Sequence, residues 1–222
     1  MKIKLIHLLL SAFTLLVLTS CDVVEGPKVD PEGFSGSANK VLIEDFTGHM
    51  CGNCPRAHEQ ATALHDTYGD NLVIVAVHAG TFARVVNSLG FTTDFNTEMG
   101  AKLEEEYDAD NAGLPKGLIN RRQYGGSYLT NYPDWSTHVS TVLAESPQLG
   151  LEMVSTYDDN SREFEVDVNM EYFTTGDATH QVVVLITEDH IISKQNDYSL
   201  ASGHIDDYEQ NHCLLYTSPS PR

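Results

Sequence analysis

Two cysteines separated by two residues are the part of this chain whose types and spacing best suit chemistry. Cys51 and Cys54 follow an apolar stretch and precede a helical pattern. Two intervening residues at a helix start bring both sulfurs within disulfide reach and leave the first nearer solvent. The helix dipole and the free N–H groups there favour a thiolate at Cys51. We therefore predict Cys51 as the nucleophile and Cys54 as the resolving thiol.

Other uses of a cysteine pair can be weighed from the neighbouring residues. Covalent haem attachment is excluded, because it needs His directly after the second cysteine and Pro55 stands there. Zinc would need His49 and His58 to join the thiolates, whereas structural zinc usually takes a second, separated ligand pair. A permanently closed disulfide is common in exported proteins. We expect no metal and no cofactor, and the redox and structural uses of the pair both stay open.

The elements on either side of the pair can be read from apolar periodicity. Three apolar residues, Val41, Leu42 and Ile43, followed by Phe46, predict a buried strand leading to the cysteines. The helix after them repeats small or apolar residues at spacings of four, three and four, namely Ala57, Ala61, Leu64 and Tyr68. Residues 72–77 are continuously apolar, which is typical of a central strand. Strand, helix and strand in this order predict a right-handed parallel unit.

The following residues complete this first domain. Residues 80–96 lack periodicity and predict a loop or short helix, and residues 98–107 predict an acidic helix. Pro115 precedes a short strand at 117–119, where a tight turn is needed. A glycine pair at 125–126 then predicts a hairpin turn, and Pro133 opens a last helix with Trp135, Val139 and Val142 on one face.

The pattern changes to a period of two after Pro147. Apolar and polar residues alternate over 149–153 and 163–172, with turn residues at 158–160, and a third strand is expected at 182–186. These predict half-buried antiparallel strands. We therefore expect a second, all-β and sandwich-like domain over residues 147–212, cut short because three strands bury little.

The N-terminus has the pattern of an export signal. Lys2 and Lys4 precede an apolar run at 5–18, which is too short for a comfortable membrane span. The run leads into Leu18-Thr19-Ser20-Cys21, a sequence of the lipobox type. Residues 1–21 thus resemble a bacterial lipoprotein signal peptide, which implies acyl chains on Cys21 and a lipid anchor in the membrane. Residues 22–39 are rich in Gly, Pro, Ser and acids, and predict a flexible tether.

The C-terminal residues 213–222 look like the translation of a transposase adapter used to prepare sequencing libraries. We interpret them as not biological. Cys213 then drops out of the cysteine count and Cys21 is reserved for lipid, which leaves Cys51 and Cys54 as the remaining pair.

The charge of the chain restricts its partners. Its 222 residues contain 32 acidic and 13 basic residues, a formal net charge of −19. Such a charge argues against electrostatic binding to nucleic acid or to an anionic membrane surface.

The order of elements over residues 40–145 resembles the thioredoxin-like superfamily. A strand leads to Cys-x-x-Cys at a helix start, and a second strand, a Pro-led strand, a hairpin and a final helix follow. The resemblance implies that Pro115 is cis and packs against the disulfide, and that Asp45, six residues before the first cysteine, acts on the resolving thiol. Met50 and Asn53 replace the Trp and Pro that are usual before the two cysteines.

With the lipobox and the trailing β segment, the chain resembles outer-membrane lipoproteins of Bacteroidetes that carry a thioredoxin-like domain. The resemblance implies a lipid-anchored protein of the cell envelope, at the outer membrane. One hypothesis is a thiol-disulfide oxidoreductase acting on protein thiols or disulfides, with Cys51, Cys54, Asp45 and Pro115 as the catalytic set and Glu44 as the alternate acid. The other is a binding or adhesin-type surface lipoprotein whose disulfide is structural.

Overall fold

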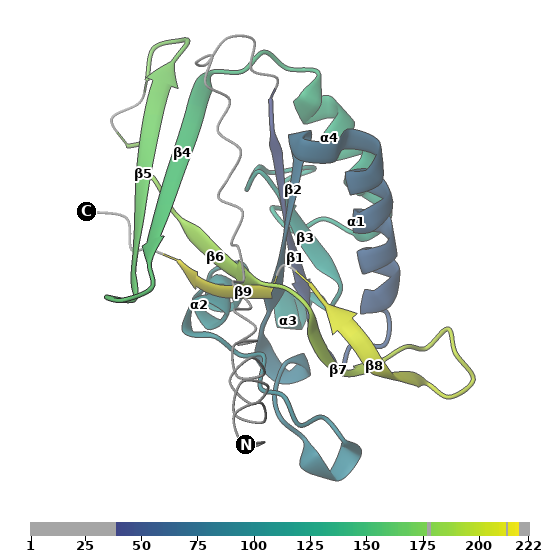
Figure 1. Cartoon of the computed structure of the whole chain (residues 1–222). Helices are drawn as coiled ribbons and strands as arrows, with labels where there is room; N and C mark the ends of the chain where they lie inside the picture. Colours follow the sequence, from purple (N-terminus) through teal and green to yellow (C-terminus); the bar gives the residue numbers. More distant parts are fainter. Residues whose placement is uncertain (1–38, 177–178, 212, 218–222) are drawn as a thin grey trace, which may run out of the picture. The chain divides into compact units, whose positions relative to one another are not determined.

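The computed structural model describes residues 39–176, 179–211 and 213–217 (Figure 1). The expected signal peptide, Cys21 and nearly all of the tether lie outside the described residues. Contacts divide the described chain into a hairpin unit, residues 151–171, and a main unit that contains the rest. The main unit is a mixed α/β fold in which helices cover a sheet, as expected.

The main unit is built on a five-stranded sheet. Its strands are β1 (Val41–Thr47), β2 (Leu72–His78), β3 (Lys116–Ile119), β6 (Leu185–Glu188) and β9 (Cys213–Thr217). They are arranged in the order β3-β1-β2-β9-β6, with β1 parallel to β2 and antiparallel to β3. The predicted strand-helix-strand unit is therefore confirmed.

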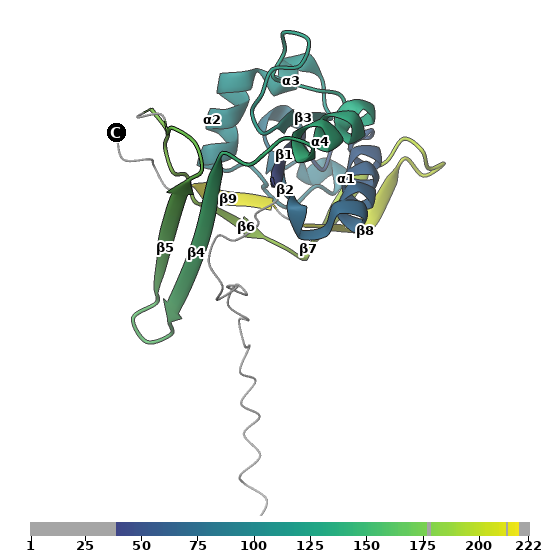
Figure 2. The ribbon, with the colours of Figure 1, turned by 90° about the horizontal axis from the view of Figure 1, so that it is seen from above.

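Two pairs of helices cover opposite faces of this sheet (Figure 2). One face carries α1 (Cys54–Tyr68) and α4 (Trp135–Leu143), and the other carries α2 (Glu98–Tyr107) and α3 (Ala109–Ala112). Because side chains alternate along a strand, Val41 and Ile43 of β1 pack in the core below α1, whereas Phe46 packs in the core below α2. The same alternation decides where the acids of β1 point.

Helix α1 begins at the second cysteine for local reasons. Pro55 occupies its first turn, where no backbone N–H is needed. The predicted apolar face is confirmed, since Ala57, Ala61 and Leu64 are buried, and Tyr68 packs against the same core. The predicted face of α4 is also confirmed, with Trp135, Val139 and Val142 buried.

The connections hold short 3-10 turns instead of long loops. Gly80–Phe82 and Asn87–Leu89 form such turns within the segment expected to be a loop or short helix. Tyr132–Asp134 leads into α4, and Gly69–Asn71 joins α1 to β2.

The hairpin unit consists of the central parts of β4 (Leu149–Asp158) and β5 (Glu163–Tyr172), which pair as a two-stranded sheet. The alternating pattern thus predicted the strands. The expectation of half-burial is wrong for several side chains, since Leu151 is 63% and Phe164 53% exposed. A lone pair of strands has no second layer to cover its apolar residues.

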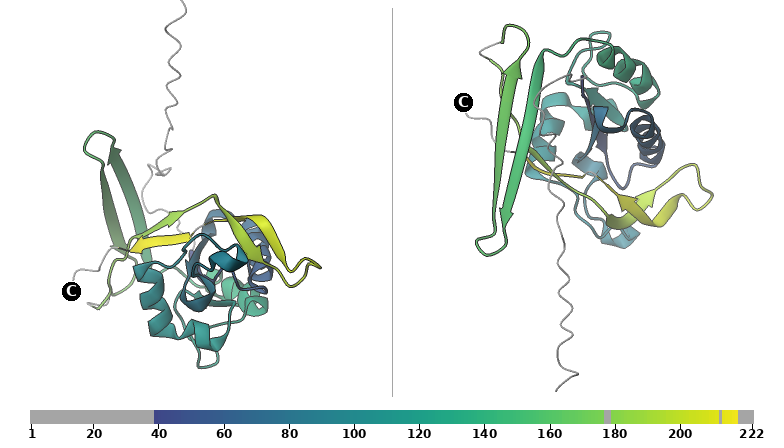
Figure 3. Two further views of the ribbon diagram at one scale, coloured as in Figure 1. Left: turned by 90° about the horizontal axis from the view of Figure 1, so that it is seen from below. Right: turned by 45° about the horizontal axis from the view of Figure 1, so that its top comes forward.

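The structure groups the chain differently from the expected domain at 147–212. Of the described residues, those from 172 to 217 belong to the main unit, together with residues 39–150. Strands β7 (Ile191–Asn196) and β8 (His204–Gln210) pair antiparallel and lie beside α1 (Figure 3). This hairpin belongs to the main unit because the side chains of Gln195 and Asn196 hydrogen-bond the loop that carries the cysteines.

Strand β9 contains the first residues of the suspected adapter segment. Cys213 pairs with Ala76 of β2, and its buried Sγ lies 3.5 Å from Nε2 of His78. The adapter origin of residues 213–222 stays a prediction, and an independently assembled gene tests it. Across the part of the chain that the structure describes, no helix is both long and apolar enough to cross a membrane.

Candidate functional site

The two cysteines are joined by a disulfide where the loop after β1 enters α1. The S–S distance is 2.06 Å and the two Cα atoms are 5.4 Å apart. Cys51 is 4% exposed and Cys54 is fully buried. Cys51 is the more exposed of the two, as expected, but it too is buried, because a distant segment of the chain covers it.

That segment is Gln195–Tyr198, at the end of β7, which we call the strap. The backbone N–H of Asn196 donates to the carbonyl of His49 at 2.8 Å, and the N–H of Tyr198 donates to the carbonyl of Gly52 at 2.9 Å. The side-chain amide of Asn196 donates to the carbonyl of Met50 at 2.9 Å. The strap thus follows the cysteine loop residue by residue.

Gln195 joins the strap to the cysteine loop and to β8 by side-chain hydrogen bonds. Its Nε2 donates to the carbonyl of Cys51 at 2.9 Å, and its Oε1 accepts a hydrogen bond from Nε2 of Gln210 at 2.8 Å. Gln195 is fully buried and Gln210 is 2% exposed. Buried amides of this kind are stable only when they are paired, so the two glutamines hold the hairpin in one position over the disulfide.

Gly52, between the cysteines, allows this close approach. A Cβ at position 52 would lie 2.4 Å from the ring of Tyr198, which no real contact permits. The Tyr198 ring therefore rests directly on the backbone of the Cys-x-x-Cys loop.

Asn53, between the two cysteines, borders an open groove of about 500 Å³ that neither cysteine lines. Asn53 and Arg56 form one wall, and residues 113–116 and 131–134 form the other. The Leu114–Pro115 peptide bond is cis, as the thioredoxin resemblance implied, and Pro115 is buried. The structure thus brings Pro115 and the residue before Cys54 to the same groove.

Asp45 lies inside the fold on the face of β1 that meets α1. It is 1% exposed, and its Oδ2 is 3.5 Å from Nε2 of His58. Among the described residues, its Oδ1 has no hydrogen-bond partner. Burial raises the pKa of Asp45 well above its ordinary value, because desolvation disfavours the carboxylate. The alternation of side chains along β1 explains this burial.

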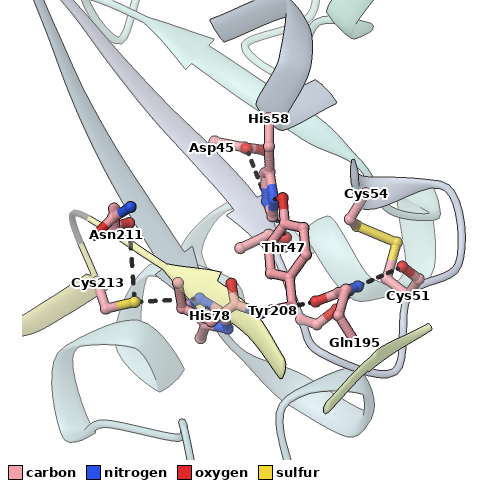
Figure 4. A network of polar contacts seen from close by, with 12 residues as sticks. Asp45, Thr47, Cys51, Cys54, His58, His78, Gln195, Tyr208, Asn211 and Cys213 are labelled. Carbon is pink, nitrogen blue, oxygen red and sulfur yellow. Dashed lines mark hydrogen bonds and ion pairs between the residues drawn. A yellow bond between two sulfur atoms is a disulfide. The ribbon is translucent and has the colours of Figure 1, made fainter. Parts of the chain in front are cut away.

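His58 connects Asp45 to the β7–β8 hairpin (Figure 4). Its Nε2 is 2.9 Å from the hydroxyl of Thr47, and its Nδ1 is 2.8 Å from the hydroxyl of Tyr208. Burial lowers the pKa of His58 to about 4, so the imidazole is neutral at neutral pH. Burial thus disfavours the charged form of both Asp45 and His58, which argues against an ion pair between them.

A cavity of about 270 Å³ adjoins this pair. Asp45, His58, His65 and Tyr208 are among the residues that line it, together with the end of β8. Its lining combines acid, imidazole and hydroxyl groups, which suits solvent or a small polar molecule better than an apolar one.

Glu44 cannot substitute for Asp45, because it points to the opposite face of the sheet. Its carboxylate accepts two hydrogen bonds from Arg121, from Nε at 2.7 Å and from Nη2 at 2.6 Å. Those bonds raise the pKa of Arg121. The alternate-acid assignment of Glu44 is therefore wrong, for the reason of strand alternation.

The histidines considered for zinc have other partners. Nε2 of His49 lies 2.9 Å from the carbonyl of Arg84, and its ring packs against Phe91 and Phe95. His58 is engaged by Thr47 and Tyr208. Within residues 39–176, 179–211 and 213–217, no three His, Cys, Asp or Glu side chains gather as metal ligands would.

Several residues of the site have no role in the sequence-based prediction. Gln195, Tyr198 and Tyr208 lie more than 140 positions after the cysteines, and no local sequence pattern connects them to the pair. His58 carried a usable signal, because it follows Cys54 by four residues and so lies on the same face of α1.

The fold and the site define the class as a mixed α/β protein with a covered disulfide at a helix N-terminus. The chain belongs to the outer membrane protein Omp28 family, whose profile matches residues 101–220. This family places the chain in the cell envelope, at the outer membrane. A crystal structure of a protein from Agrobacterium tumefaciens shares the fold, with a TM-score of 0.52 and 17% identity over 82% of this chain and 72% of that one. No curated protein matches the chain.

Proposed function

We propose that this Omp28-family protein is a lipid-anchored thiol-disulfide oxidoreductase with a thioredoxin-like domain. The thioredoxin-like assignment is supported by the parallel β1–α1–β2 unit, by β3 antiparallel to β1, and by α4 after them. The observation that carries the function is the groove that Asn53, beside the disulfide, shares with the cis Pro115. A polypeptide lying in this groove would contact Asn53, which directly precedes Cys54.

The chemistry is thiol-disulfide exchange between the protein dithiol and a substrate disulfide, and it proceeds in two steps. In the reduced protein, the Cys51 thiolate attacks a substrate disulfide, forms a mixed disulfide and releases one substrate thiolate. Cys54 then loses its proton to Asp45 and attacks the Cys51 sulfur, which closes the protein disulfide and releases the second substrate thiolate. The substrate gains two electrons, the dithiol loses two, and the same steps run backwards when a substrate dithiol is oxidised.

Trapping tests this assignment directly. A reduced Cys54→Ser variant should stop at the mixed disulfide with a disulfide-bonded model polypeptide, because no resolving thiol remains. The matched Cys51→Ser variant should trap little, since Cys54 is fully buried. Non-reducing gels and mass spectrometry measure the adduct. Equal trapping by both variants, or by neither, would contradict the proposed roles.

The anchor is a separate part of the proposal. Acyl chains on Cys21 hold the protein at the membrane, with residues 22–39 as a tether. Cys21→Ala should release the protein into the soluble fraction. A variant that still needs detergent for extraction would remove the lipid anchor from the proposal.

A second function is favoured by one observation, the strap. Because Gln195–Tyr198 covers Cys51, the disulfide can act as a staple for the helix start, in a surface lipoprotein that binds or adheres through other residues. This binding function requires no exchange. The trapping experiment separates the two, because a staple gives no mixed disulfide with either variant.

A further inference from the structure

The polar network around Asp45 contains two side chains, His58 and Tyr208, that have no role in the exchange steps described above. We infer that His58 and Tyr208 pass protons between Asp45 and solvent, and so act through Asp45 on the exchange at the cysteine pair. This inference rests on the proposed function. It concerns how the buried acid is reset, and it names no new substrate.

Asp45 is 1% exposed between β1 and α1, and the end of β8 faces it across the 270 Å³ cavity that Asp45, His58 and Tyr208 line. The relay gives its proton a defined path out of this buried position. An acid that stays protonated cannot accept the Cys54 proton until it has released its own. The nearest titratable neighbour is His58, with Nε2 3.5 Å from Oδ2 of Asp45.

The contacts of His58 allow both of its neutral tautomers. With the proton on Nδ1, the ring donates to the hydroxyl of Tyr208 and its Nε2 accepts from Thr47 or from a protonated Asp45. With the proton on Nε2, the ring donates toward Thr47 or Asp45 and its Nδ1 accepts from Tyr208. Neither tautomer leaves a ring nitrogen without a partner.

Tyr208 provides the outer end of the path. Its hydroxyl is 2.8 Å from Nδ1 of His58, and its half-buried ring lines both the 270 Å³ cavity and a shallow surface hollow beside Glu59 and Asp66. Burial raises its pKa to about 12, so it carries a proton onward without ionising for long.

The proton count balances in one concerted relay. The Asp45 proton moves to Nε2 of His58, the Nδ1 proton moves to the Tyr208 oxygen, and the original Tyr208 proton leaves to solvent. Asp45 becomes a carboxylate, while His58 and Tyr208 stay neutral. Asp45 can then take the proton of Cys54 as that thiol attacks.

Tyr208→Phe is the primary test, since it removes the hydroxyl and keeps the ring that packs on His58. Decay of the mixed disulfide is followed by stopped flow in H₂O and in D₂O. Asp45→Asn should slow the decay by roughly tenfold or more, and Tyr208→Phe should slow it by about threefold to tenfold with a smaller solvent isotope effect. Tyr157→Phe, at an exposed position on β4, is the matched control and should change neither.

The outcomes separate the relay from the proposed function. Slow decay in Asp45→Asn with normal decay and isotope effect in Tyr208→Phe would overturn the relay alone, and would mean that Asp45 exchanges protons with the cavity directly. Absence of any mixed disulfide in the wild-type protein would overturn the proposed function and the relay together.

Chemical rescue distinguishes proton transfer from packing. His58→Ala should slow decay, and imidazole should restore it by entering the adjoining cavity. 1-Methylimidazole has nearly the same shape but no N–H, so it should not restore the rate if a proton must pass through both ring nitrogens. Equal rescue by both compounds would overturn the relay.

Discussion

On one side the β7–β8 hairpin covers the cysteine loop, whereas on the other side Asn53, between the two cysteines, borders an open groove. The covered side belongs to β7 and β8, whose strap hydrogen-bonds the cysteine loop and whose Tyr208 reaches His58. The open side belongs to the Pro115 loop and the start of α4. Under the proposed function, a polypeptide substrate would approach from the groove, while the hairpin covers the cysteine loop on the other side.

The largest effect is expected from filling the groove. Asn53 is exposed and its side chain makes no capping hydrogen bond, so Asn53→Trp adds bulk without removing a contact. Exchange with a polypeptide disulfide should fall by roughly tenfold or more, because misplaced reactants lose up to about 10² in rate. Reduction by dithiothreitol should change little, since this reagent is small.

The same substitution at Asp70, an exposed residue beyond the end of α1, is the control for the added Trp. Equal rates for wild type and Asn53→Trp with the polypeptide would mean that substrates do not use the groove.

A smaller effect is expected from loosening the strap. Gln195→Ala removes the donor to the Cys51 carbonyl and the acceptor for Gln210. Each buried group left unpaired costs about 1–3 kcal/mol, so the free energy of unfolding should fall by that order. The disulfide should also be reduced faster by dithiothreitol. Gln123→Ala, at an exposed position, serves as the control, and an unchanged reduction rate would show that the strap does not shield the pair.

The smallest effect is a change in how stability depends on pH. Because the folded pKa of Asp45 is raised, its contribution to stability is fully present below its unfolded pKa and is lost as pH rises through the folded pKa. Asp45→Asn removes this loss. The variant should therefore gain stability relative to wild type as pH rises above about 4, the ordinary pKa of an unfolded Asp, as urea unfolding at several pH values measures. Parallel curves would contradict the raised pKa.

The side of β1 on which each acid lies and the buried face of α1 could be predicted from the sequence, because both follow from local side-chain patterns. The apolar alternation of β1 decides which acids face α1, and it correctly predicts the burial of Asp45. The same rule, applied to Glu44, already excludes it as the alternate acid. The helix spacing of Ala57, Ala61 and Leu64 likewise predicts which face of α1 is buried.

The covered side could not be predicted in the same way. Gln195 and Asn196 are polar residues on a short strand, and nothing in their local pattern indicates partners some 145 positions earlier in the chain. The alternation after Pro147 predicted strands but not their grouping, since β6 and the β7–β8 hairpin join the main unit. Long-range polar pairing therefore explains why the β7–β8 hairpin groups with the main unit and why Cys51 is buried.

The measurement that tests the central claim most directly is the reduction potential of the Cys51–Cys54 pair, from equilibration of the intact protein in thiol-disulfide buffers. Structural disulfides in secreted proteins typically have potentials below about −300 mV, whereas exchanging pairs have higher ones. The proposed oxidoreductase predicts a potential above about −300 mV. A potential below that value would contradict the oxidoreductase and favour a structural disulfide under the strap.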